Sequence, residues 1–286
     1  MVVQFNEVRL SFDAWDFRTT CSTKRMDRSM KWKIASASVA GTSHHSASKS
    51  CEDCHATSMV TGSNEAEILV AIAADGAGSA AHGGTGARLI CEAFCSHFQE
   101  KLKTADLSHL RLEDIKEVVS AARARVYRES SILNVEPREL AATMVAAVVG
   151  PQVALFRQIG DGAIVIGQDD GYGVVFWPDA GEYANMTRFV SDADAFEYLH
   201  YDMRTAPDEV ALFTDGIQRL ALVFSTKSAH SPFFAPMFTQ LRSASTDVLE
   251  SLPTKLAGFL DSDVVNQRTD DDKTLILATR RASEDL

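Results

Sequence analysis

The chain is organised as a series of apolar runs, and several of these runs end at an aspartate. Strands are predicted for "KWKIASASVAG", which begins at residue 31, and for "EILVAIAAD", which ends at Asp75. Further strands are predicted for "TMVAAVV", "VALFRQI", "AIVI", "VVFW", "EVALF" and "TLILAT". The middle four are separated only by short turns, whereas a parallel crossover needs a dozen or more residues. We therefore predict that they form an antiparallel meander.

Helical spacing follows the strand that ends at Asp75. Two consecutive helices are predicted from apolar positions three or four residues apart, namely Leu89, Ile90, Ala93, Phe94, Phe98 and Leu102, and then Leu112, Ile115, Val119, Ala122 and Val126. A later helix, from Phe233 to Leu241, is expected to pack on the core. Strands in runs and helices in pairs predict an α+β sandwich in which helices cover the sheets.

The composition adds few constraints. Of the 286 residues, 45% are hydrophobic and 23% charged, which is typical of a globular protein. A net charge of −11 argues against a nucleic-acid groove or an anionic-membrane patch. Five cysteines and no leader-like segment favour a reduced, cytoplasmic protein without disulfides. We expect residues 1–30 to be an N-terminal extension and residues 31–286 to be a single domain.

Four acidic residues lie beside predicted strands. Asp75, Asp161 and Asp215 follow apolar runs, and Asp271 shortly precedes the last apolar run. If these strand ends lie on one side of the sheets, their carboxylates converge and repel one another unless a cation neutralises them. Oxygen ligands favour Mg²⁺, Mn²⁺ or Ca²⁺. Taken singly, each Asp-Gly pair is more simply read as a turn.

The set of motifs, in its order and spacing, resembles the protein phosphatase 2C family of metal-dependent serine/threonine phosphatases. "CEDCHA", "AADGAGS", "AATMVAAVV", "IGDGAIVI", "LFTDGIQRL" and "TDDDKTLILAT" resemble six of its motifs, over residues 34 to 280. The segment "GTSHHSASKSCEDCHA" is most similar to a bacterial branch.

This resemblance implies two central antiparallel β-sheets flanked by pairs of helices. It also implies two Mg²⁺ or Mn²⁺ ions, which activate a shared water that hydrolyses phosphoserine or phosphothreonine in proteins. The implied ligands are Asp75, bridging both ions, with the Gly76 carbonyl, Asp215 and Asp271, and Glu52 and Asp53 directly or through water. Asp272 occupies the place of the family's Asn, so Asp271 is preferred to it as a metal ligand, although the run from Asp270 to Asp272 leaves both open as candidates. The implied partners are a phosphorylated protein and a cognate serine/threonine kinase.

The chain departs from the family pattern in three places. The family's phosphate-gripping Arg is absent, and Lys49, His44 or His45 could replace it. The general-acid His is replaced by Ala77, which leaves metal-bound water, His44 or His82 to protonate the leaving group.

The third departure concerns a third ion, which some family members hold between two aspartates. Asp161 is present, but Arg219 stands where the second aspartate is expected. The arginine argues against a third ion, and its side chain could pair with Asp161 instead.

Two other functions remain open. A catalytically silent phosphoprotein-binding or regulatory module would keep the fold, and the missing Arg and His favour it, whereas the retained aspartates favour the enzyme. A phosphatase for small metabolites is the other. Cys51-x-x-Cys54-His55 with Cys91 and Cys95 could form a zinc site, although these spacings are not typical of zinc fingers.

Overall fold

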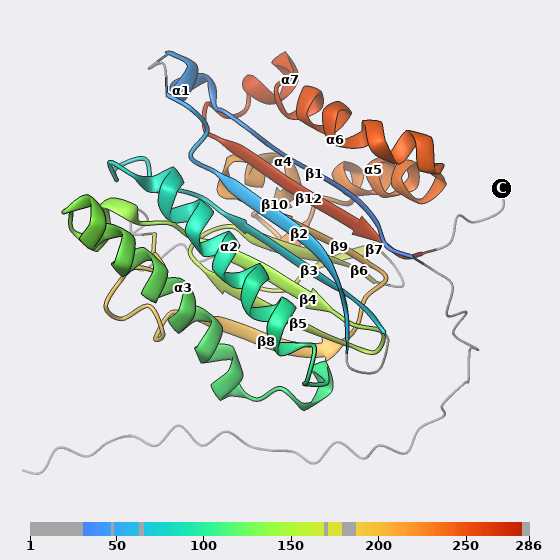
Figure 1. Ribbon diagram of the computed structural model, residues 1–286. Coiled ribbons are helices and arrows are strands. Elements are labelled where there is room, and N and C mark those ends of the chain that lie inside the picture. The colour runs from blue at the N-terminus through green and yellow to red at the C-terminus, as the bar shows by residue number, and fades with distance from the viewer. Residues whose placement is uncertain (1–30, 47–48, 63–65, 169–170, 179–186, 282–286) are drawn as a thin grey trace, which may run out of the picture. The chain divides into compact units, whose positions relative to one another are not determined.

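The computed structural model of the chain describes residues 31–46, 49–62, 66–168, 171–178 and 187–281. The predicted extension, residues 1–30, lies outside the described residues. Within them, two five-stranded sheets are stacked, with strand orders β1-β12-β9-β6-β7 and β2-β3-β4-β5-β8 (Figure 1). All strand pairs in both sheets are antiparallel. The predicted α+β sandwich of two antiparallel sheets is confirmed.

The elements have the following bounds. The first sheet contains β1 (Lys33–Val39), β6 (Ala163–Gln168), β7 (Gly171–Val174), β9 (Glu209–Phe213) and β12 (Lys273–Thr279). The second contains β2 (Cys54–Thr61), β3 (Glu67–Ala74), β4 (Met144–Val149), β5 (Val153–Ile159) and β8 (His200–Thr205). The helices are α1 (Thr42–Ser46), α2 (Gly83–Lys101), α3 (Leu112–Leu133), α4 (Gln218–Ala221), α5 (Ser231–Ser243), α6 (Thr246–Leu260) and α7 (Asp263–Asn266). A small hairpin, β10 (Leu222–Val223) with β11 (Ser228–Ala229), and three short 3₁₀ turns, Leu107–His109, Pro137–Leu140 and Asp215–Ile217, complete the described elements.

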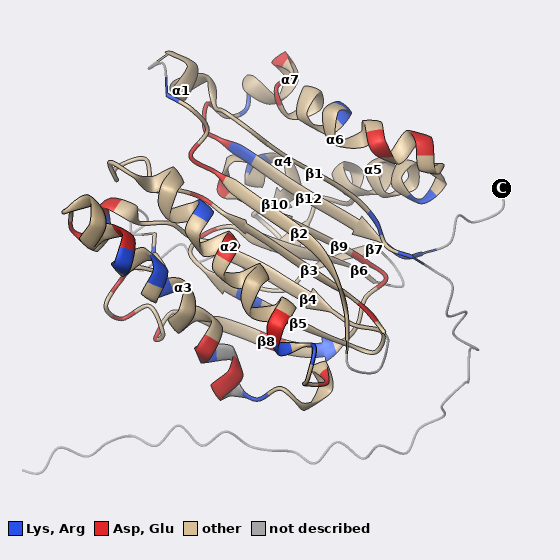
Figure 2. Cartoon of the chain, viewed as in Figure 1, with Lys and Arg blue, Asp and Glu red and all other residues tan. Residues whose placement is uncertain are grey.

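Hydrophobic burial explains the layers. Strands β3 and β4 are buried on both faces, because one face packs against the other sheet and the other face against α2 and α3. Helices α5 and α6 cover the first sheet, with Phe234 and Phe238 fully buried as the pattern predicted. Figure 2 shows the strands largely free of charge, with charged residues on helices and at strand ends. None of the helices in the described ranges is both long and apolar enough to cross a membrane.

The predicted meander is wrong in one respect that matters for the site. Strands β4 and β5 pair in one sheet, while β6 and β7 pair in the other. The chain changes sheets at Gly160, whose φ of +98° is a left-handed conformation that favours glycine. A side chain there would also lie 2.6 Å from Thr143 Cγ2. The switch places Asp161 at one end of the sandwich.

Other differences from the sequence prediction are local. β2 and the edge strand β8 were not predicted. β2 mixes polar and apolar residues without a clean alternation, and β8 has only two apolar residues, Tyr201 and Met203, which are exposed. The strand expected at "VVFW" lies earlier, at β7, and the chain bends at residues 175–176.

Candidate metal site

Asp75 is delivered by the end of β3. Its backbone N–H donates to the Thr143 hydroxyl (3.0 Å), and its carbonyl accepts from the Thr143 N–H (2.8 Å). Next to it, Gly76 touches the start of α2, where a side chain would lie 2.4 Å from the Gly83 carbonyl carbon. The backbone of Asp75 is therefore fixed on both sides, while its carboxylate is left to point out of the sheet.

Two further aspartates lie next to strands of the first sheet, Asp161 before β6 and Asp215 after β9. Asp161 lies in the link where the chain changes sheets, and its Oδ2 accepts from the Thr187 hydroxyl (2.7 Å). The Gln218 side-chain amide donates to the Asp161 carbonyl. Asp215 follows β9 and opens a 3₁₀ turn. Each carboxylate is thus positioned by backbone that neighbouring segments hold.

These three carboxylates converge. One oxygen from each of Asp75, Asp161 and Asp215 lies within 4.8 Å of the other two. We call these residues the acidic trio. In the part of the chain that the structure describes, it is the one group of three or more His, Cys, Asp or Glu residues close enough to share an ion.

Burial and mutual repulsion dominate the electrostatics. Burial, followed by the charges of Asp53, Asp215, Asp271 and Asp161, holds the pKa of Asp75 well above its usual range. Burial and then the charge of Asp161 raise the pKa of Asp215 to about 8. No lysine or arginine of the described residues forms an ion pair with the trio. A divalent cation would favour the charged form of all three.

Asp53 adds a fourth carboxylate behind the trio. It is buried, and its Oδ2 accepts from the hydroxyls of Thr214 and Thr274, both at 2.7 Å. Its Oδ1 has no hydrogen-bond partner. Burial raises the pKa of Asp53 to about 7, although the two hydroxyls oppose this shift. A buried oxygen without a donor fits a bound cation or its water.

Asp271 lies at the exposed rim of the same site. Partial burial of its carboxylate, and then the neighbouring Asp272, raise the pKa of Asp271. The resemblance paired Asp271 with Asp215 as ligands, and both line one cavity of about 660 Å³. The trio itself is completed by Asp161, which the resemblance linked only to a third ion.

Asp272 has a different surrounding. Its Oδ1 accepts from the Gly41 N–H (2.7 Å) and lies 2.9 Å from His44 Nδ1, while its Oδ2 accepts from the Glu52 N–H. The other ring nitrogen, His44 Nε2, lies 3.6 Å from Glu52 Oε2. Protein donors therefore occupy both Asp272 oxygens, and the carboxylate acts as a clasp between three segments.

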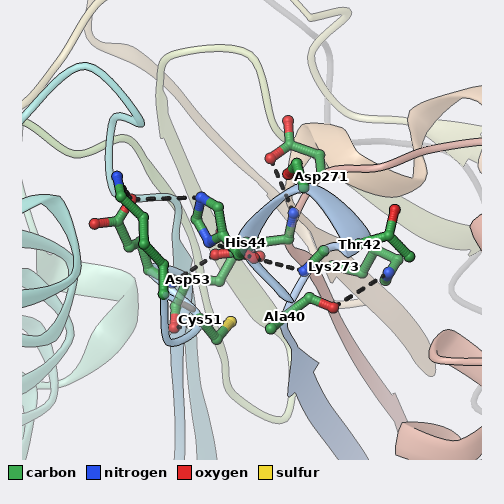
Figure 3. A network of polar contacts seen from close by, with 12 residues as sticks. Ala40, Thr42, His44, Cys51, Asp53, Asp271 and Lys273 are labelled. Atoms are coloured by element: carbon green, nitrogen blue, oxygen red, sulfur yellow. Dashed lines mark hydrogen bonds and ion pairs between the residues drawn. The ribbon is translucent and has the colours of Figure 1, made fainter. Parts of the chain in front are cut away.

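Figure 3 shows His44, Asp53, Asp271 and Lys273 in the polar network around this clasp. Both ring nitrogens of His44 face carboxylates outside the acidic trio, and among the described residues no contact joins the ring to the trio.

The other predicted contact residues lie around the rim. Lys49 Nζ is 4.0 Å from Glu52 Oε2, and the side chain is half exposed. His45 is exposed on α1. His82 precedes α2, and its N–H donates to the Glu139 carbonyl (2.8 Å). Among the contacts of described residues, none joins these three side chains to the trio.

Two arrangements that the sequence left open do not occur among the described residues. Arg219 makes no ion pair with Asp161 within the described part of the chain; the Asp161 carboxylate accepts from Thr187 instead. The cysteines do not form a zinc cluster there either: the four that the structure describes are free thiols, and Cys91 Sγ donates to the Cys54 carbonyl (3.5 Å).

Sequence reasoning missed the residues that orient the carboxylates. Thr143, Thr214 and Thr274 lie inside motifs already recognised, so their hydroxyls were visible as candidates. Gln218 lies in the same motif as Thr214, whereas Thr187 lies outside all the motifs and carries no pattern that marks it; Asp161, the partner of both, is distant in sequence.

Comparison with known proteins gives a consistent result. The sequence pattern of the family described as protein phosphatase 2C matches residues 40–261. Serine/threonine-protein phosphatase 3 of Escherichia coli (strain K12) is 39% identical over 252 residues, which cover 87% of this chain and 98% of that protein.

Solved structures resemble the fold at low sequence identity. A bacterial serine phosphatase superposes with a TM-score of 0.58 at 13% identity, covering 89% of this chain and 100% of that one. The catalytic domain of the phosphatase PstP, in complex with two manganese ions, superposes with a TM-score of 0.52 at 17% identity, covering 87% and 97%. At these identities the likeness concerns the fold alone.

Proposed function

The chain belongs to the protein phosphatase 2C family, and from this premise we propose that it hydrolyses phosphoserine and phosphothreonine in proteins with the help of divalent metal ions. The observation that carries the proposal is the acidic trio. Three carboxylates from distant segments lie within 4.8 Å of one another, without a basic partner among the described residues. A fold that kept these groups only for stability would be expected to pair them.

The residues fit a pair of Mg²⁺ or Mn²⁺ ions. All donors are oxygens, and Asp53 Oδ1 and Asp161 Oδ1 are buried without a hydrogen-bond partner. We propose that Asp75, Asp161 and Asp215 hold the ions. Further ligands would come from Asp53 and Asp271, the Gly76 carbonyl and, directly or through water, Glu52. Bound there, the ions would lower the pKa of a shared water and neutralise the phosphoryl oxygens.

The chain's own groups have three tasks in this reaction. The hydroxyls of Thr214 and Thr274 orient Asp53, and the Thr143 backbone and hydroxyl fix Asp75. Asp272 joins the Gly41, His44 and Glu52 segments, so we assign it a positioning role in place of a ligand role. The 660 Å³ cavity beside Asp215 and Asp271 admits the phosphorylated residue.

Phosphate transfer to water needs no covalent intermediate here. We propose that the carboxylates of the trio serve as metal ligands and not as nucleophiles, so that water attacks phosphorus and displaces the seryl or threonyl oxygen directly. Because His44 faces two carboxylates, we assign it no proton transfer in this conformation. His82, before α2, stays a candidate for protonating the leaving oxygen.

The test is hydrolysis of a phosphothreonine peptide with Mn²⁺ or Mg²⁺ by the native chain and by Asp75→Asn. We expect activity in the native chain and its loss in the variant. Asp247→Asn, which changes an exposed carboxylate on α6, is the matched control and should keep full activity. No activity in the native chain with either metal would instead support the silent regulatory module. A preference for small phosphate metabolites over peptides would support the metabolite phosphatase.

We further propose that a serine/threonine kinase of the same cell supplies the substrates, and that both act in the cytoplasm. The reaction requires phosphorylated serine or threonine, and the four described cysteines are free. Accumulation of phosphoproteins after deletion of the gene, reversed by deletion of the kinase, would test the pairing. Fractionation that finds the protein outside the cytoplasm would contradict the location.

For the domain limits, we propose that residues 31–286 form one phosphatase domain and that residues 1–30 are an extension. The family match within residues 40–261 supports this. A chain that begins at Lys31 should fold and keep its activity on p-nitrophenyl phosphate. Loss of folding in that chain would contradict the limits.

A further inference from the structure

The cavity beside the acidic trio is lined by side chains of both charges. Asp215 and Asp271, which we call the acidic wall, line it together with Asp270. Arg219, Arg268 and Phe224 line the same cavity, and we call these three residues the basic wall. The acidic wall belongs to the metal site described above, but nothing in that chemistry uses the basic one.

The two arginines are available for a ligand. Neither makes an ion pair or a hydrogen bond through its side chain among the described residues, and both are exposed. Arg128 on α3 is also exposed and unpaired, but among the described arginines without such a contact only Arg219 and Arg268 line this cavity. An unpaired guanidinium is a ready partner for a carboxylate or phosphate.

Their backbones are fixed close to the metal site. Arg219 lies on α4 directly after Gln218, whose side chain is bonded to the Asp161 carbonyl. The Arg268 N–H donates to the Val265 carbonyl (2.8 Å). The loop that leads from Arg268 to Asp271 is held at the Asp270 carbonyl, which accepts from the N–H and the hydroxyl of Ser43. Both arginines therefore extend from fixed backbone and line the same cavity as Asp215 and Asp271.

Phe224 gives the same wall an apolar part. Its side chain is half exposed, and its ring meets the Trp177 ring edge-on at 5.4 Å. An aromatic residue that is held in place but left open to solvent beside two arginines suits a peptide better than inorganic phosphate.

On the premise of the proposed phosphatase function, we propose that this basic wall binds the peptide next to the phosphorylated residue and selects substrates with an acidic side chain there. The selected group is a carboxylate of Asp or Glu, or a second phosphate. It lies close enough in sequence to the scissile phosphate that both anions enter one cavity. Cations bound at the trio would reduce the repulsion that this anion would otherwise meet from Asp215 and Asp271.

The experiment uses phosphothreonine peptides that differ at one flanking position, occupied by Glu, Gln or Lys, with that position moved from three residues before to three after the phosphothreonine. We expect kcat/KM with Mn²⁺ to favour Glu over Lys at one or two positions, on the order of five-fold. Added salt should reduce the preference. In the double variant Arg219→Glu with Arg268→Glu, the ratio should fall to one or reverse.

Controls separate the possible failures. Lys116→Glu with Arg128→Glu makes the same double charge change at two exposed positions of α3 and should keep the native ratio. The milder variant Arg219→Gln with Arg268→Gln, followed by thermal unfolding, shows whether any loss reflects misfolding. Equal rates for the Glu and Lys peptides in the native chain would overturn the proposal. So would an equal loss for all peptides in the variants, because the arginines would then hold the scissile phosphate itself.

p-Nitrophenyl phosphate distinguishes this inference from its premise. If the native chain hydrolyses it but does not discriminate between peptides, only the selection by the basic wall is wrong. If the native chain hydrolyses neither p-nitrophenyl phosphate nor any peptide, the phosphatase function fails and the selection fails with it.

Discussion

Strand β9 buries a carboxylate near each of its two ends, and the surroundings of the two are opposite. Glu209, at its start, is 1% exposed, and its Oε1 lies 2.7 Å from Arg242 Nη1 and 3.2 Å from the Thr279 hydroxyl. Arg281 approaches its Oε2 at 3.9 Å. Asp215, just past the other end, faces Asp75 and Asp161 without a cation from the protein. One strand thus shows a carboxylate kept for structure and a carboxylate kept for a ligand.

The difference is one of charge compensation. A buried carboxylate with complementary donors contributes little net stability but is costly to break. Like charges held together are destabilising, and a fold retains them where an ion is to be bound. The pKa values follow the same division: that of Asp215 is raised to about 8, through burial and then through Asp161.

The largest expected effect is on activity, from Asp215→Asn. Removing one oxygen ligand should lower kcat/KM by about 10³-fold, comparable to loss of a key electrostatic group. In chelator, the same variant should unfold at higher urea than the native chain, because one of three repelling charges is gone. Phosphopeptide hydrolysis and urea denaturation measure the two effects. Lower stability of the metal-free variant would mean that repulsion does not dominate at this end.

Glu209→Gln is the counterpart at the other end of the strand. It should lower the free energy of unfolding by about 3 kcal/mol, because the buried end of Arg242 loses its charged partner. Its kcat/KM should change far less than that of Asp215→Asn. Asp208→Asn is the matched control: this neighbouring carboxylate is 56% exposed and pairs with Arg280, so its loss should cost under about 1 kcal/mol. If the two variants lowered the free energy of unfolding equally, the distinction between the buried and the exposed ion pair would not hold.

The aspartates of the site could be predicted from the sequence to different degrees. Asp75 and Asp215 were visible because each ends a long apolar run, which fixes where the carboxylate emerges. Asp161 was visible too, but its position depends on the change of sheet at Gly160. In the sequence, a short turn with glycine looks the same whether the chain folds back on its own sheet or crosses to the other sheet. The predicted meander therefore failed where the site is built.

The compensating partners were harder to predict. Glu209 meets Arg242 from α5, 33 residues later, and nothing local connects them. The same holds for Asp272, whose donors come from Gly41, His44 and Glu52, far away in the chain. Long-range pairing of this kind arises from sheet order and helix placement, and a single sequence carries that information only through family resemblance.

An intermediate effect is expected from pH in the absence of metal. The pKa values of Asp53 and Asp215 are raised to about 7 and about 8 in the folded chain, chiefly by burial. The folded state then binds more protons than the unfolded state between roughly pH 4 and 8, so stability falls as pH rises. In chelator, the urea midpoint should therefore drop from pH 5 to pH 8.

Saturating Mn²⁺ should remove most of this fall in the urea midpoint, because the ion replaces the protons on the carboxylates and binds only the folded site. The control is Glu209→Gln, which leaves the acidic trio intact. Its urea midpoint in chelator should be lower at pH 5 than that of the native chain and should fall with pH in the same way. A midpoint that rises steadily to pH 8 in chelator would show that the carboxylates of the trio are not mutually destabilising.

The smallest effect should come from Thr214→Val, which removes a hydroxyl without adding volume to the core. Asp53 Oδ2 would keep only its bond from Thr274, so the carboxylate would be held less firmly and charged less readily. Groups that orient a metal ligand typically contribute about ten-fold or more to metal affinity. We expect about a ten-fold higher Mn²⁺ concentration for half-maximal activity, with little change in the rate at saturation. Thr214→Val also removes the acceptor of the buried Thr274 N–H (3.1 Å), so it should weaken folding as well. Thr279→Val makes the same change beside Glu209 and should weaken folding while leaving the Mn²⁺ requirement as it was. If both variants shifted the Mn²⁺ requirement alike, hydroxyls at the two ends of β9 would have the same role, and the contrast between the ends would not extend beyond the carboxylates themselves.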